Sequence, residues 1–133
     1  IEQKLRPLMQ VGLGYLHLNQ SLSTLSGGEL QRVKLASYLD SKGKVFILDE
    51  PTDGLHVKDI HHILRLFDTM VDQGNTIYLI EHNLDVLKAA DYVIELGPGG
   101  GLMGGEKLFA GTPSALLEST NSVTAPYLAR ELP

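Results

Sequence analysis

The chain has 133 residues, a length typical of one domain with a core of its own. Its hydrophobic content of 43% and charged content of 20% are ordinary for a globular protein, and the lack of cysteine excludes disulfides and thiolate zinc sites within it. A net charge of −5 argues against a nucleic-acid-binding surface on this segment. No apolar run approaches the roughly 18 residues that span a bilayer. We expect a cytoplasmic protein and, because the chain starts at Ile1 instead of methionine, a processed product or a fragment.

Helical and extended patterns alternate along the chain. Apolar side chains at three- and four-residue steps predict amphipathic helices, and short continuous apolar runs predict strands of a parallel sheet covered on both faces. Helix caps are predicted at Ser26, Asn83 and Thr112, and Gly74 is placed to end the longest helix. In chain order we predict helices over 3–13, 27–40, 57–71, 84–89, from 113 and over 124–132, strands over 45–48, 76–80 and 92–96, and turns over 97–105. This order is typical of an α/β fold with a mostly parallel sheet flanked by helices.

A glycine pair marks the predicted start of the second helix, in Ser26-Gly27-Gly28-Glu29. Glycine lets a backbone approach a phosphate closely, the first N–H groups of a helix carry positive partial charge, and Ser26 adds a hydroxyl donor. Glu29 follows Ser26 by three residues, which is also the spacing of an ordinary capping box. The capping box alone explains these four residues, so a phosphate-binding role needs support from elsewhere in the chain.

Two adjacent carboxylates, Asp49 and Glu50, directly follow the first apolar strand. In α/β folds, ligands bind at the carboxyl ends of the strands. Asp49 can hold Mg²⁺ there through water, because that ion keeps several of its waters. Glu50 is placed to orient or deprotonate the water that attacks a terminal phosphate. The plain alternative, a solvated turn before Pro51, is disfavoured by the apolar strand that runs straight into both carboxylates.

His82 ends the second apolar strand, about thirty residues after Glu50. An imidazole at that point can hydrogen-bond a phosphate oxygen. A lone histidine at a strand end is more often structural, so its place after the carboxylate pair is what favours a functional role. The spacing of His56, His61 and His62 does not put two metal ligands on one helix face, and we expect His61 and His62 on a polar face.

The three motifs and their order resemble the signature, Walker B and switch-histidine motifs of ABC-type ATPases, and residues 31–36 extend the signature match. Asp53-Gly54-Leu55-His56 resembles the D-loop of the UvrA family, the DNA-damage-recognition subunit of the bacterial excision-repair nuclease. Transporter-type members have aspartate in place of His56, and UvrA more often has a small or hydroxyl residue in place of Asp53. The resemblance to UvrA, best to the C-terminal part of its second ATPase module, continues over 11–15, 72–76, 81–86, 96–106 and 110–113.

The resemblance implies a partial ABC-type P-loop ATPase domain without its phosphate-loop half, since no Gly-x-x-x-x-Gly-Lys-Ser/Thr segment occurs. It implies a single domain over 1–133, with signature helices over 1–43 and the Walker B and switch-histidine part over 44–133. In this family two modules pack head to tail. The resemblance therefore assigns catalysis on the module's own ATP to Glu50 and His82 with Mg²⁺ at Asp49, and contact with the partner module's ATP to Ser26, Gly27, Gly28 and Glu29.

The resemblance also implies cofactors and partners for the full-length parent. These are ATP and Mg²⁺ with no zinc in this segment, a homodimer, and contacts with DNA and excision-repair proteins through regions outside this chain, with no membrane involved. The fragment alone is expected to be inactive as an ATPase, because it lacks the phosphate-binding loop. Two alternatives remain open: a UvrA-like ABC ATPase in drug resistance, and the nucleotide-binding subunit of a transporter.

Overall fold

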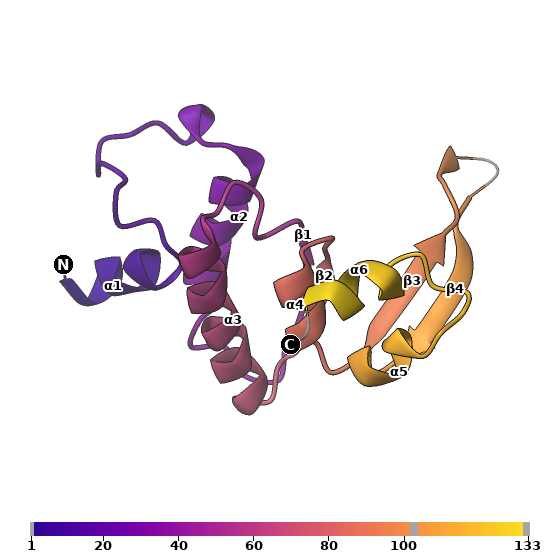
Figure 1. Cartoon of the computed structure of the whole chain (residues 1–133). Helices are drawn as coiled ribbons and strands as arrows, with labels where there is room; N and C mark the ends of the chain where they lie inside the picture. Colours follow the sequence, from indigo (N-terminus) through magenta and orange to yellow (C-terminus); the bar gives the residue numbers. More distant parts are fainter. Residues whose placement is uncertain (1, 102–103, 132–133) are drawn as a thin grey trace. The chain divides into compact units, whose positions relative to one another are not determined.

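The computed structural model describes residues 2–101 and 104–131 (Figure 1). The chain divides into two compact units that join between Glu81 and His82. The first unit contains α1 (Glu2–Gln10), the 3₁₀ helix η1 (Leu22–Thr24), α2 (Gly27–Ala36), β1 (Val45–Asp49), α3 (Val57–Asp72) and β2 (Thr76–Ile80). The second contains α4 (Leu84–Ala89), β3 (Val93–Gly97), β4 (Glu106–Gly111), α5 (Pro113–Leu117), α6 (Ala125–Leu128) and the 3₁₀ helix η3 (Ala129–Glu131).

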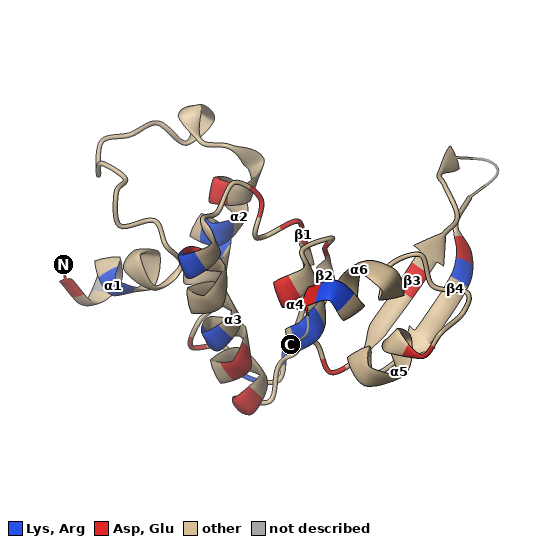
Figure 2. Cartoon of the chain, in the orientation of Figure 1, with Lys and Arg blue, Asp and Glu red and all other residues tan. Residues whose placement is uncertain are grey.

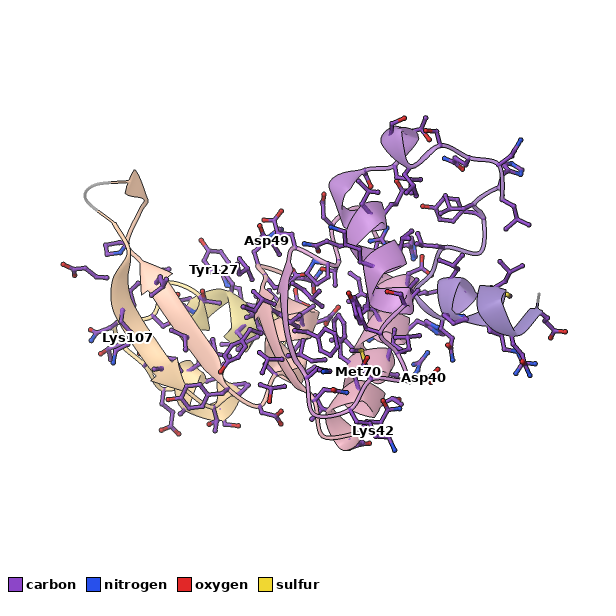
Figure 3. The ribbon with its side chains drawn as sticks, turned by 180° about the vertical axis from the view of Figure 1, so that it is seen from behind. Asp40, Lys42, Asp49, Met70, Lys107 and Tyr127 are labelled. Carbon is purple, nitrogen blue, oxygen red and sulfur yellow. The ribbon has the colours of Figure 1, made fainter. Side chains whose placement is uncertain are left out.

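The first unit is built on a parallel strand pair. β1 pairs with β2 in a register that runs from Val45↔Thr76 to Asp49↔Ile80, and α3 makes the crossover that parallel strands require. Figure 1 shows α2 and α3 side by side next to this pair. The apolar stripe predicted for α3 is buried along its middle, and Met70, labelled in Figure 3, is fully buried. The core cluster joins α2, α3 and β1 through Val11, Leu13, Leu35, Ala36, Leu39, Leu48, Ile63, Phe67 and Met70.

The second face of this strand pair is exposed among the residues that the structure describes. Ile47 is 72% exposed and Tyr78 is 57% exposed, whereas Leu48, on the opposite face of β1, is buried at 8%. Within the described residues this strand pair is therefore covered on one face, whereas the prediction was of strands covered on both. Side chains alternate across a strand, so helices on one side of the pair bury only every second residue.

Local capping signals are confirmed by the structure. Ser26 and Glu29 form a complete capping box at the start of α2, and Asn83 and Thr112 cap α4 and α5 through their side chains. Gly74 has φ of +86° and donates its N–H to Val71, which ends α3 in the left-handed conformation that glycine adopts easily.

Two predicted helices end earlier than expected. α1 stops at Gln10 instead of residue 13, because Gly12, at φ of +77°, donates to Met9 and closes a left-handed cap. α2 stops at Ala36 instead of residue 40, because the hydroxyl of Ser37 donates to the Lys34 carbonyl at 2.6 Å and ends the helical ladder.

The second unit contains an antiparallel pair, which corrects the prediction of a mostly parallel sheet. β3, predicted as a third parallel strand, pairs with β4 from Val93↔Gly111 to Gly97↔Glu106. The connection between them is shorter than the dozen or so residues that a parallel crossover needs, so the two strands run in opposite directions. The last predicted helix is divided between α6 and η3, and its predicted end at residue 132 lies outside the described residues. Val93, Leu116 and Leu128 form the core of this unit.

Charged residues of both signs are spread over the helices, and Figure 2 shows both on α3. Within residues 2–101 and 104–131, no helix combines the length and apolar character needed to cross a membrane.

Candidate functional site

The predicted Mg²⁺ ligand Asp49 and the predicted catalytic residue Glu50 lie where β1 ends. Asp49 is the last residue of β1 and pairs with Ile80, so β1 and β2 end at the same edge of the pair. Figure 3 shows Asp49 at this end. The N–H of Glu50 donates to the Ile80 carbonyl at 2.8 Å, although Glu50 has a left-handed φ of 47°. That conformation costs an L-residue about 1–2 kcal/mol, so the surrounding contacts must hold it.

The signature glycines and the carboxylates line one depression of about 270 Å³. Its walls are formed by Gly27, Gly28, Gln31, Asp49, Glu50 and Asp53. These six residues include three carboxylates and no lysine or arginine, so the depression attracts cations and repels a bare triphosphate. The structure thus brings together the residues that the sequence places at the start of a helix and at the end of a strand.

The start of α2 is organised around Glu29. Tyr15 donates its hydroxyl to Glu29 Oε1, while Oε2 accepts from the N–H and the hydroxyl of Ser26 at 2.7 and 2.8 Å. These hydrogen bonds, with that of Tyr15 the largest, lower the pKa of Glu29 to about 2. Glu29 is therefore ionised at neutral pH and engaged by the cap. The N–H groups of Gly27 and Gly28, in the first helical turn, are the donors left for an anion, since such groups have no intrahelical acceptor.

The turn after Glu50 is held by hydrogen bonds from two sides. Arg32 of α2 donates Nη1 to the carbonyls of Pro51 and Asp53 at 3.2 and 3.4 Å. Glu81 accepts from both the N–H and the hydroxyl of Thr52, at 2.9 and 2.6 Å. The hydrogen bond from Arg32 to Pro51 is buried, and the one to Asp53 and the two that Glu81 accepts are partly buried.

The remaining D-loop residues serve the backbone between β1 and α3. Gly54 has φ of +70°, a left-handed conformation that glycine allows, and Leu55 packs against the core of the first unit. His56 is the N-cap of α3 and accepts from the N–H of Lys58 through Nδ1. The residue that differs from the transporter pattern thus has a structural function as a helix cap.

His82 belongs to the second unit and follows Glu81 directly. It lines an open depression of about 500 Å³ with Leu84, Val123, Thr124 and Tyr127, the last labelled in Figure 3. His61 and His62 are exposed on α3, which agrees with the predicted polar helix face.

The side chains of this site alone do not provide a full set of ligands for a metal ion. Among the residues that the structure describes, no group of three or more histidine, aspartate or glutamate side chains is arranged to hold a metal ion. A single exposed carboxylate, Asp49, fits Mg²⁺ held through water, because that ion keeps waters and takes its remaining ligands from phosphates.

Three residues of the site were not singled out from the sequence: Arg32, Thr52 and Glu81. A signal for Arg32 was present, since it shares one helix face with the apolar Leu35 and Ala36, three and four residues later, and a buried arginine is rare. Thr52 and Glu81 carry no comparable signal, because their contact joins residues 29 positions apart.

The sequence of the chain is similar to those of known proteins. Residues 2–53 match the family model for ABC transporters. The chain is 55% identical to UvrABC system protein A of Lactococcus lactis subsp. lactis (strain IL1403) and 53% identical to that of Staphylococcus aureus (strain COL), over 99% of this chain in both cases. It spans 14% of the length of each of these relatives.

Solved structures agree with these relatives. UvrA2 from Deinococcus radiodurans superposes with a TM-score of 0.89 at 42% identity, over 98% of this chain and 16% of that one. An ATP-binding cassette of an ABC transporter superposes with a TM-score of 0.57 at 23% identity, over 97% of this chain and 48% of that one, which shows a shared fold alone. The chain therefore belongs to the UvrA family, as a segment of its ABC transporter-type ATPase domain.

Proposed function

We propose that this chain is the C-terminal part of the second ABC ATPase module of a UvrA-like protein that uses ATP in DNA damage recognition during nucleotide excision repair. The observation that carries this proposal is the depression that joins the signature glycines Gly27 and Gly28 to Asp49 and Glu50. The identity of 55% to a UvrABC system protein A, maintained over 99% of the chain, supports the choice of family member.

In this proposal Asp49, Glu50 and His82 serve the ATP of their own module. Asp49 would hold Mg²⁺ through water, and the ion would supply positive charge beside the phosphates. Glu50, exposed at the end of β1, accepts a hydrogen bond from the attacking water and orients it. His82 donates a hydrogen bond to a terminal phosphate oxygen.

Ser26, Gly27 and Gly28 serve the ATP of the partner module. The N–H groups of Gly27 and Gly28 at the start of α2 provide positive partial charge for the γ-phosphate. Ser26 joins them when its hydroxyl turns from Glu29 to the phosphate. Two modules packed head to tail complete each site, and the full-length protein acts as a homodimer on DNA and with excision-repair proteins through regions outside this chain.

The uncovered face of β1 and β2 supports a place inside a larger module. Val45, Ile47, Tyr78 and Ile80 are each more than half exposed on this face, and contiguous apolar surface of this kind is typical of an interface. The depression also has no cation to bind phosphates, so we expect no ATPase activity from the isolated chain.

A UvrA-like ABC ATPase in drug resistance is the second candidate, and the superposition with UvrA2, at 42% identity over 98% of this chain, fits any UvrA-like protein. The identity of 55% to UvrABC system protein A over 99% of this chain supports the repair protein. A transporter subunit is supported by fold similarity alone, at 23% identity.

The test is steady-state ATP hydrolysis by the full-length protein with Glu50→Gln. This change keeps size and hydrogen bonding but removes the charge that orients the water, so hydrolysis should fall about 10²–10⁴-fold while ATP stays bound. Glu118→Gln, the same change at an exposed position after α5, should leave hydrolysis unchanged. Equal hydrolysis in both variants would show that Glu50 is not the general base.

A further inference from the structure

The main chain of the turn that contains Glu50 takes part in several hydrogen bonds, both within the turn and with other elements. The N–H of Asp53 donates to the Glu50 carbonyl at 3.1 Å, which closes the turn. Pro51 is fully buried and Thr52 is 6% exposed, whereas Glu50 and Asp53 on either side are exposed. The middle of the turn is therefore an anchor, and the two acidic side chains extend from it.

One anchor comes from the signature helix. Arg32 is 3% exposed, and its Nη1 binds the Pro51 and Asp53 carbonyls, while its Nε is buried without a hydrogen-bond partner among the described residues. Burial of an incompletely bonded guanidinium is unfavourable, and an apolar side chain of similar size would fill the same space without that penalty. The gain from arginine here is the fixed position of two carbonyls of the turn.

The other anchor comes from the end of β2. Glu81 Oε1 accepts from the Thr52 N–H and from its hydroxyl, so one carboxylate oxygen fixes both the main chain and the side chain of this residue. Arg32 thus binds hydrogen-bond acceptors of the turn, its carbonyl oxygens, and Glu81 binds hydrogen-bond donors of the same turn.

We propose that Arg32 and Glu81 are positioning residues for Glu50. By holding Pro51, Thr52 and Asp53, they fix the backbone that keeps Glu50 at its left-handed φ of 47°, and so fix the direction of its carboxylate. This inference rests on the proposed function, in which Glu50 orients the attacking water. Neither Arg32 nor Glu81 is required to touch nucleotide.

The test is a set of kinetic variants of the full-length protein. Arg32→Met and Glu81→Leu remove one anchor each, and each should lower kcat for ATP hydrolysis about 10- to 100-fold with KM for ATP unchanged, because misplacing a catalytic group affects the chemical step. Glu81→Gln keeps the acceptor oxygen and should retain near-normal kcat. Arg65→Met, the same change as Arg32→Met at an exposed position on α3, is the matched control and should be neutral.

If Arg32 acts by positioning Glu50, the loss of kcat in Arg32→Met must depend on the presence of Glu50. A double variant tests this dependence. In a Glu50→Gln background, Arg32→Met should cause almost no further loss, because the group it positions is gone. Thr52→Val removes one hydroxyl and keeps the main-chain N–H and the side-chain volume, so it preserves the fold. We expect a loss of kcat of about 5-fold.

Three results would overturn the inference: unchanged kcat in folded Arg32→Met and Glu81→Leu proteins, an undiminished effect of Arg32→Met in the Glu50→Gln background, or no recovery with Glu81→Gln. If Glu50→Gln itself leaves hydrolysis intact, it is the proposed function that fails, and the two failures are thereby distinguished.

Discussion

Each unit of the chain has a glutamate that holds a threonine, and the two arrangements use the same chemistry. In the first unit Glu81 Oε1 accepts from the N–H and hydroxyl of Thr52, and in the second Glu95 Oε1 accepts from the N–H and hydroxyl of Thr124, at 2.9 and 2.7 Å. Glu95 also accepts from the N–H of Val123 at 3.1 Å. The same two donors of a threonine are bound in both places.

The two arrangements differ in the side chains next to the bound threonine. Thr52 lies in the turn of Glu50 and Asp53, whereas Thr124 begins α6 and its neighbours Ser122 and Val123 carry no ionisable group. Glu95 is also 9% exposed, in the core-facing register of β3. Hydrogen bonds of this kind alone therefore do not reveal a catalytic role. The side chains attached to the held backbone decide whether such an anchor serves chemistry or stability.

The largest expected effect is that of a glycine-to-aspartate substitution at Gly28 in the first unit. The same substitution in the second unit serves as its control. Gly28→Asp should lower hydrolysis at the partner module's site by at least about 100-fold, because a carboxylate placed beside a γ-phosphate repels it and hinders closure of the two modules. A Cβ at Gly28 would lie 3.4 Å from the Asp53 carbonyl, so the backbone can accept it with small adjustments. Fluorescent ATP binding at the module's own loop should persist.

Gly100→Asp in the second unit is the control, because a Cβ there meets nothing within 4 Å. The proposed head-to-tail arrangement is contradicted if Gly28→Asp abolishes ATP binding at the module's own loop and leaves the partner site hydrolysing normally.

A smaller effect, on stability alone, is expected at Glu95. Glu95→Leu removes the acceptor of the Val123 N–H and of the Thr124 hydroxyl, while the Thr124 N–H keeps its hydrogen bond to Ser122 Oγ. The change should lower the free energy of unfolding by about 1–3 kcal/mol, measured by urea denaturation, with kcat unchanged. If kcat of Glu95→Leu falls about 10- to 100-fold, as is expected for Glu81→Leu, the proposed difference between the two glutamates is wrong.

The pH dependence sharpens this prediction. Burial of Glu95 opposes ionisation, but hydrogen bonds from Ser122, Thr124 and Val123 outweigh it and lower its pKa below 4.5. A lowered folded-state pKa gives stabilisation that is fully present above pH 4.5 and is lost as the pH falls through the folded-state value. Glu95→Gln should remove this part of the acid dependence of unfolding.

The smallest effect is expected at Tyr15. Tyr15→Phe removes the hydrogen bond that contributes most to the low pKa of Glu29, so that pKa should rise from about 2 toward 4.5 in an NMR titration of the side-chain carboxyl. Ser26 still completes the capping box, so α2 should stay intact. A pKa that remains at about 2 would show that Ser26 alone holds the carboxylate ionised.

Local signals in the sequence were sufficient for the helix caps and for much of the candidate site. Ser26, Asn83 and Gly74 act within three residues of their partners or through their own φ, so residue type and spacing predict them. The apolar strand that ends in Asp49 and Glu50 was predicted for the same reason.

Contacts between distant residues were beyond the sequence patterns. The antiparallel pairing of β3 with β4, the uncovered face of β1 and the bond from Arg32 to Pro51, 19 positions away, depend on how separate elements meet. An apolar strand has the same sequence pattern in either direction, and a buried arginine has the same letter as an exposed one. Sequence patterning therefore predicted candidate reacting groups, but it did not predict the residues that hold the turn after Glu50.

The most direct test of the account is a structure of the full-length protein with Glu50→Gln, bound to ATP and Mg²⁺. We expect Asp49 and the side chain at position 50 to face the nucleotide held by their own module. We expect Ser26, Gly27 and Gly28 to contact the γ-phosphate of the nucleotide held by the partner module. Both sets of residues on a single nucleotide, or Asp49 remote from any phosphate, would contradict it.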